Sequence, residues 1–143
     1  IYGTATGELL SCIQRLQNLC ARIVLDSFDY LNYDGSQLVE KLGWSTVHQR
    51  YHYFMSLMVY KCMQGRAPHY LANNITFLRE INVYPIREYR YNDVHVPNIK
   101  SEMGRKSFAY SGPKIWNSLP TELKKCTSVN GFKRLYKDTL VNT

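Results

Sequence analysis

The stretch of residues 106–140 sets the expected fold of the C-terminal half, and it reads KSFAYSGPKIWNSLPTELKKCTSVNGFKRLYKDTL. Ser111-Gly112-Pro113 is typical of a helix entry with proline in the first turn, and Pro120 is expected to end that helix. Ser128 is expected to cap a final helix. Phe108, Trp116 and Phe132 are expected core residues. The inner face of the final helix should also carry Val129, Leu135 and Leu140.

The N-terminal half predicts longer helices. Residues 8–25 have an apolar stripe at helical spacing and a polar face opposite it. Ser36 is expected to cap a short helix that Gly43 ends, and Ser45 a long helix over residues 46–64 that Gly65 ends. The stripe on the first helix consists of Leu9, Ile13, Leu16, Cys20, Ile23 and Val24, and the polar face of Ser11, Gln14, Arg15, Asn18 and Arg22.

The helical period is lost between residues 74 and 106, where proline and glycine interrupt the chain. Short strands are expected here, for example at residues 93–96 and 106–110. The predicted fold class is therefore mainly α with a small β insertion. Two parts, residues 1–73 and 74–143, are expected to form one compact unit, because 143 residues is the length of a single domain.

The charge is positive and uneven. The formal net charge is +7; residues 1–72 hold six Lys/Arg against five Asp/Glu, whereas residues 73–143 hold twelve against six. A basic half of this kind favours polyanions, nucleic acid before an acidic membrane surface, although ordinary solubility charge gives the same pattern.

No catalytic or metal site is predicted. The sequence has no adjacent pair of aspartates that could hold the two metal ions of a polymerase, and no Walker or HExxH motif. Its four cysteines form no C-x-x-C pair, and His48 and His52, four residues apart, have no evident third zinc ligand. We therefore expect no cofactor and reduced thiols. No apolar run reaches 18 residues and no secretory signal is present, so an intracellular protein without a membrane partner is expected.

Four groups of residues could contact nucleic acid. Arginine and lysine bind phosphate, and tyrosine rings can stack on unpaired bases. The alternative for the lysines is a solvated helix face. The alternative for Tyr89 and the neighbouring Tyr91 is a half-buried strand. The first group is Gln14, Arg15, Asn18 and Arg22; the second is Arg87, Tyr89 and Arg90; the third is Lys100, Arg105, Lys106 and Lys114 around a helix N-terminus; the fourth is Lys133, Arg134 and Lys137, with Lys124 and Lys125 nearby.

Several motifs resemble the C-terminal region of reverse transcriptases from LINE-type, non-long-terminal-repeat retrotransposons of the Jockey-like group. The most specific is FAYSGPKIWNSLP at residues 108–120, and residues 132–140 resemble the closing helix of that region. Upstream, the similar segments are Leu16-Gln17-Asn18 with Ala21-Arg22-Ile23-Val24, residues 37–44, and Tyr60-Lys61 with Gly65 and Ala67-Pro68-His69-Tyr70-Leu71. Residues 74–100 match weakly, through Arg87 and Pro97.

The resemblance implies a piece of an RNA-directed DNA polymerase that lies after its catalytic palm: a helical thumb-like part followed by a basic post-thumb part. It implies no catalytic residue here and a location in cytoplasm and nucleus. The chain begins without methionine, as an excised piece would. The expected partners are RNA, DNA or an RNA–DNA hybrid, and the rest of the polymerase. A structural module that packs on the palm, and a host-domesticated interaction protein without enzymatic activity, are the alternative hypotheses.

Overall fold

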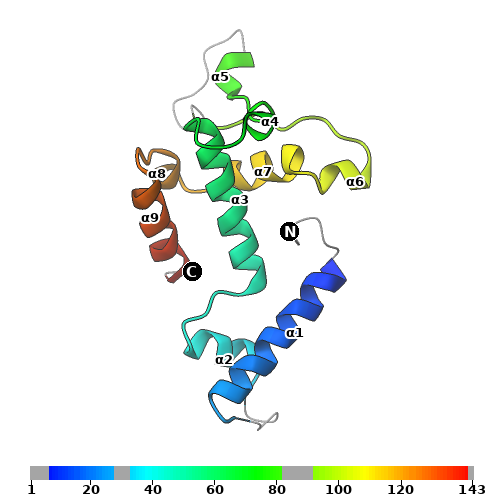
Figure 1. Cartoon of the computed structure of the whole chain (residues 1–143), viewed down its shortest axis with the longest axis vertical. Helices are drawn as coiled ribbons and strands as arrows, with labels where there is room; N and C mark the ends of the chain where they lie inside the picture. Colours follow the sequence, from blue (N-terminus) through cyan, green and yellow to red (C-terminus); the bar gives the residue numbers. More distant parts are fainter. Residues whose placement is uncertain (1–6, 28–32, 82–91, 142–143) are drawn as a thin grey trace. The chain divides into compact units, whose positions relative to one another are not determined.

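The computed structural model describes residues 7–27, 33–81 and 92–141, and this part of the chain is mainly helical (Figure 1). Residues 140 and 141 are described by their backbone alone. The prediction of a mainly α fold is confirmed. The helices in the described residues are α1 (Gly7–Val24), α2 (Gly35–Lys41), α3 (Val47–Met63), α4 (His69–Ala72), α5 (Leu78–Ile81), α6 (Glu102–Arg105), α7 (Phe108–Asn117), α8 (Thr121–Lys124) and α9 (Val129–Val141).

The chain divides into two compact units, residues 1–51 and 52–143, so that the boundary lies within α3. The sequence pattern had placed the expected boundary after residue 73. The excess of positive charge lies entirely in the second unit. The first unit holds four Lys/Arg against five Asp/Glu, a net charge of −1, and the second holds fourteen against six, a net charge of +8.

In the first unit, α2 packs on the side of α1 that the sequence pattern marks as polar. Ala21 is fully buried against Leu38 and Val39 of α2. The backbones approach closely here, because a Cβ added to Gly35 would lie 2.7 Å from the Cβ of Asn18. The small residues at positions 21 and 35 therefore decide which face of α1 is covered.

The ends of the helices follow the expected chemistry with small shifts in position. Gly43 and Gly65 both have a φ of +65°, which lets the chain reverse at the end of each helix. The N–H of the residue that follows each glycine then donates to a carbonyl of the preceding helix. The predicted cap of the final helix is confirmed, because the hydroxyl of Ser128 accepts the N–H of Gly131 at 3.0 Å. The two caps predicted in the N-terminal half are each displaced. Asp34 rather than Ser36 precedes α2, and its N–H donates to the side chain of Gln37. Thr46 rather than Ser45 caps α3 through reciprocal bonds with Gln49.

Stacked aromatic rings form the core of the second unit, where α3, α7 and α9 come together (Figure 1). Phe132 of α9 lies 4.8 Å from Tyr60 and 6.0 Å from Trp116, measured between ring centroids, and the pairs are nearly parallel. Tyr136 lies 5.9 Å from Phe132 in a tilted arrangement and meets the ring of Tyr53 edge-on at 5.2 Å, measured between ring centroids. Burial raises the pKa of Tyr60, Tyr53 and Tyr136. The prediction that Trp116 and Phe132 are core residues is confirmed, and Phe108 packs against the same core.

Residues 106–110 are not a strand, so this prediction was wrong. Ser107 is the N-cap residue of α7, and its carbonyl accepts the N–H of Ser111. Pro113 therefore lies inside the helix rather than in its first turn. Its missing N–H costs one backbone bond. Gly112 lets α7 approach α3, because a Cβ there would lie 3.1 Å from Val59. Packing at this crossing outweighs the local preference of proline for a helix start.

Residues 93–96 form only a single bridge, an antiparallel pair of Phe77 and Val94. Leu78 N–H donates to Asp93 at 3.0 Å, and His95 N–H donates to Thr76 at 2.8 Å. Among the residues that the structure describes, no second strand pairs with the other side of this segment. The expected β insertion is therefore absent from the described residues.

The side chain of Asn117 takes the place of that missing strand. Its Oδ1 accepts the N–H of Val94 at 2.9 Å, and its Nδ2 donates to the carbonyl of Val94 at 2.8 Å. Val94 is completely buried, so these two backbone groups have no access to water. Trp116 Nε1 donates to the carbonyl of Asn92 at 2.9 Å. Two neighbouring residues of α7 thus hold residues 92–94 on the core.

We expect Asn117→Ala to lower the free energy of unfolding by about 3 kcal/mol, because it leaves the buried N–H and C=O of Val94 without partners. Urea denaturation followed by circular dichroism measures this change. Asn130→Ala, an exposed position on α9, is the matched control and should change stability by less than about 0.5 kcal/mol. Equal stability of the two variants would contradict the assigned role of Asn117.

We expect Gly35→Ala to destabilise the packing of α2 on α1 by about 1–3 kcal/mol, since the new methyl group would collide with Asn18. Gly7→Ala is the control, because nothing lies within 4 Å of an added Cβ there. Hydrogen exchange of the α1 and α2 amides reports the local effect. Unchanged protection in Gly35→Ala, relative to Gly7→Ala, would show that the helices do not pack this closely.

Candidate nucleic-acid interface

The first predicted group lies on the face of α1 that packs on its own unit. Gln14 accepts the N–H of Val47 at 2.9 Å and donates to Asn18 Oδ1 at 2.9 Å. The guanidinium of Arg22 donates to the carbonyl of Tyr33 at 2.8 Å, and this side chain is 7% exposed. These three side chains support the first unit. Only Arg15 of this group is exposed.

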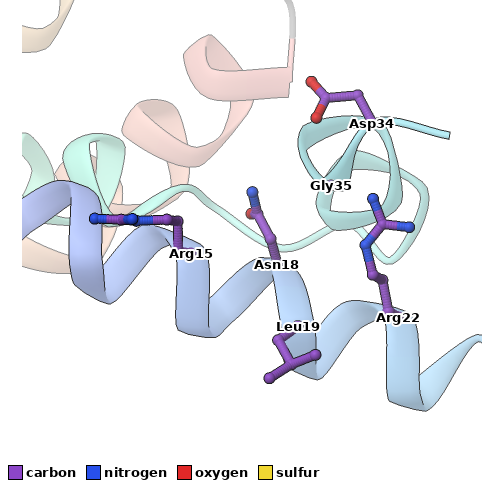
Figure 2. A pocket seen from close by; sticks show the side chains of 6 residues that line it. All are labelled: Arg15, Asn18, Leu19, Arg22, Asp34 and Gly35. Carbon is purple, nitrogen blue, oxygen red and sulfur yellow. The ribbon is translucent and has the colours of Figure 1, made fainter. Parts of the chain in front are cut away.

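A pocket of about 180 Å³ opens beside these residues, between α1 and the start of α2 (Figure 2). Arg15, Arg22 and Asp34 are the charged residues of its lining, but the guanidinium of Arg15 extends away from α2 and donates to Cys12 Sγ at 3.3 Å. A hydrogen bond from the hydroxyl of Ser36 lowers the pKa of Asp34. The pocket is smaller than ordinary ligand sites and does not suit a nucleotide. Its lining consists of Arg15, Asn18, Leu19, Arg22, Asp34 and Gly35.

The second predicted group, Arg87, Tyr89 and Arg90, lies outside the described residues. Its role stays a prediction. The third and fourth groups lie in the second unit and are described in full.

The third group surrounds α6 and the beginning of α7, two helices that contact each other. Lys100 and Lys114 are exposed. Arg105 donates from Nε to the carbonyl of Ile99 at 3.0 Å, which leaves the rest of its guanidinium at the surface. Lys106 pairs with Glu102 at 3.0 Å, and the Glu102 side chain is 87% exposed. Such an exposed pair is weak, so Lys106 can exchange it for a phosphate.

The expected phosphate site at a helix N-terminus near residues 111–113 is absent. The N–H of Ser111 bonds the carbonyl of Ser107, one turn inside α7. Backbone amides bind anions only in the first turn of a helix, where they have no helical partner. The first turn of α7 begins instead at Phe108, directly after Lys106 and the N-cap residue Ser107.

The fourth group follows the outer face of α9. Arg134 and Lys137 are exposed, and Lys133 is half-buried between them and the core. The opposite face of α9 carries Phe132 and Tyr136, which are buried in the aromatic stack. The rigid core thus fixes the direction in which these three cations point.

Lys124 has a different role from its neighbours in sequence. Its Nζ lies 2.8 Å from Asp93 Oδ1 and 2.8 Å from the carbonyl of Asn117. The Lys124 and Asp93 side chains are 7% and 10% exposed. Lys125 is exposed. The interpretation of Lys124 as part of a basic surface was wrong, because its charge is used inside the fold.

Sequence reasoning missed this ion pair and an exposed methionine. In the sequence, Asp93 appears only within Tyr91-Asn92-Asp93-Val94, which lacks the second aspartate of a metal-binding pair. Nothing in the sequence indicates that Asp93 pairs with Lys124. Met103 of α6 is 79% exposed between Lys100 and Lys106.

We expect Lys124→Gln to lower the free energy of unfolding by about 3 kcal/mol, since it leaves the carboxylate of Asp93 buried without its cation. Lys125→Gln, which removes the same charge one residue later, should be nearly neutral. Thermal and urea denaturation of both variants measure the difference. If Lys125→Gln were as destabilising as Lys124→Gln, the assignment of Lys124 to the interior would fail.

Comparison with known proteins adds no assignment to this geometry. In the part of the chain that the structure describes, no group of three or more histidine, cysteine, aspartate or glutamate side chains could hold a metal ion. None of the helices described is long and apolar enough to cross a membrane. The chain matches no family model, and comparisons with curated proteins and with solved structures give no significant match.

Proposed function

We propose that this chain is a non-catalytic, nucleic-acid-binding region of a retrotransposon RNA-directed DNA polymerase. It holds template RNA or an RNA–DNA hybrid by backbone contacts, in the cytoplasm and nucleus. The observation that supports this proposal most is the concentration of charge: the second unit carries a net charge of +8, and the first a net charge of −1. A field of this strength attracts polyanions and steers their approach.

The form of the basic surface favours contacts to phosphate rather than to base edges. Lys100 and Lys114 are exposed lysines, and a lysine ammonium binds phosphate as a point charge. Arg134 and Lys137 are held on one side of α9 by the buried rings of that helix. Contacts of this kind position a strand without reading its sequence.

The exposed apolar side of α1 favours the alternative of a packing module. Leu16 and Ile23 are 63% and 60% exposed on that side. Exposed apolar patches mark contact surfaces. The two functions are compatible, because the apolar side lies in the first unit and the basic groups in the second.

We expect the full chain to bind single-stranded RNA, duplex DNA and an RNA–DNA hybrid at micromolar or lower concentration, measured by fluorescence anisotropy in 50 mM salt. Affinity for the duplex should fall by about 100-fold between 50 and 200 mM salt if four phosphates are contacted. The combined variant Lys100→Glu/Lys114→Glu should bind at least about 10-fold more weakly and flatten the salt slope.

Lys41→Glu/Arg50→Glu is the matched control, because it makes the same change in net charge at exposed positions of the first unit. Equal loss of affinity in both double variants would mean that net charge alone drives binding. Absence of binding by the folded wild-type chain would reject the proposed function and favour the packing module.

A further inference from the structure

Two groups of cations in the second unit are associated with helices at opposite ends of α7 (Figure 1). α6 directly precedes α7 and contacts it. α9 packs at the other end, where Trp116 in the last turn of α7 lies 6.0 Å from Phe132, measured between ring centroids. We call Lys100, Arg105, Lys106 and Lys114 the α6 surface, and Lys133, Arg134 and Lys137 the α9 surface.

The length of α7 separates α6 from the outer side of α9. α7 has 10 residues, and a helix of that length spans about 15 Å. The diameter of α9 adds about 10 Å. Figure 1 shows α6 at one end of α7 and α9 beyond the other end. The cations beside α6 therefore lie about 25 Å from the outer side of α9.

The α9 surface also faces away from α7. Phe132 is completely buried in the core between α9, α7 and α3. Because successive residues of a helix are about 100° apart, Arg134 and Lys137 point about 160° and 140° away from that ring. Both are exposed. These two cations are thus directed away from α7 and from the α6 surface.

Each surface has an excess of positive charge of its own. The α6 surface has four cations, and the acid among them is Glu102, whose exposed pair with Lys106 is weak. The α9 surface has three cations, and the acid on the same helix is Asp138. The net charges are therefore +3 and +2, so each surface attracts phosphate independently.

A short duplex is too stiff to contact both surfaces. Nucleic-acid duplexes stay nearly straight over about 150 base pairs, and even nucleosomal DNA bends by only about 45° in each helical turn. A duplex of about 14 base pairs is about 48 Å long. To reach both surfaces, it would have to turn back around α9 and α7 within that length. One short duplex therefore occupies one surface and leaves the other open.

We propose that the second unit binds two separate duplex segments of nucleic acid at once, one on the α6 surface and one on the α9 surface, and so bridges them. The inference rests on the proposed function, because it takes nucleic acid as the ligand, and it adds the number of segments held. The α6 surface should bind more tightly, since it has the larger net charge. The aromatic core between the helices keeps the two segments at a fixed distance.

Sedimentation equilibrium of the full chain tests this proposal, with a dye-labelled DNA duplex of about 14 base pairs in about 10-fold excess at about 50 mM salt. The mass of the complex gives the number of duplexes on each chain, and we expect two. Lys100→Glu/Lys114→Glu should leave only the duplex on the α9 surface. Arg134→Glu/Lys137→Glu should leave only the duplex on the α6 surface. Unchanged circular dichroism shows that both variants fold.

The matched control is Lys41→Glu/Arg50→Glu, which makes the same change in net charge in the first unit and should still hold two duplexes. In a second assay, a duplex fixed to beads should retain a fluorescent duplex only when the chain is added. Each surface variant should reduce this retention at least about 10-fold, because a single remaining surface cannot bridge.

The outcomes separate the inference from the proposed function. One duplex on each wild-type chain, two duplexes on either surface variant, or loss of both duplexes from one surface variant would overturn the inference and leave the proposed function standing. Absence of any bound duplex or RNA would reject both.

Discussion

The pairing of the Asn117 side chain with the backbone of Val94 is the interaction on which the second unit depends. A buried peptide group needs partners for both its N–H and its C=O, and among the described residues the backbone of residues 92–95 pairs with Thr76 and Leu78 on one side only. The amide of Asn117 meets the remaining need. Lys124 neutralises the carboxylate of Asp93 and bonds the carbonyl of Asn117, so that α7, α8 and this segment form one polar network above the aromatic stack.

This network explains part of the sequence motif by structure rather than by ligand binding. Within residues 108–120, Gly112 allows the approach of α3, Trp116 fills the core and Asn117 holds Val94. Lys114 is the exposed cation of the motif. The motif therefore combines a scaffold with one surface charge, and the surface groups on α6 and α9 can vary without disturbing the core.

Helical periodicity predicted most of the elements, because the repeat of apolar residues and the Gly43 and Gly65 stops are local signals. The strand at residues 106–110 was wrong since Phe108 and Tyr110 favour strands locally, while packing of α7 on the core favours a helix. The sequence pattern also did not predict which side of α1 packs on α2. That side depends on Ala21 and Gly35 fitting together, and hydropathy alone marks the opposite side.

The candidate site was predictable only as a set of cations. Lys124 and Lys125 are indistinguishable in sequence, yet one is buried in an ion pair and the other is exposed. The difference depends on Asp93, which lies 31 residues away along the chain. Long-range pairs of this kind leave no periodic trace, so neither the buried lysine nor the half-buried Lys133 could be separated from the basic surface by pattern.

The position of Asn117 has a further consequence for chemical ageing of the protein. Asparagine deamidates when the backbone nitrogen of the next residue attacks the side-chain carbonyl, which requires a mobile backbone and a free amide. Here both ends of the amide are bound to Val94, and the N–H of Ser118 is bound to the carbonyl of Ile115 at 3.2 Å. The contacts that hold the segment in place therefore also slow conversion of Asn117 to aspartate, a change that would set a negative charge against the carbonyl of Val94.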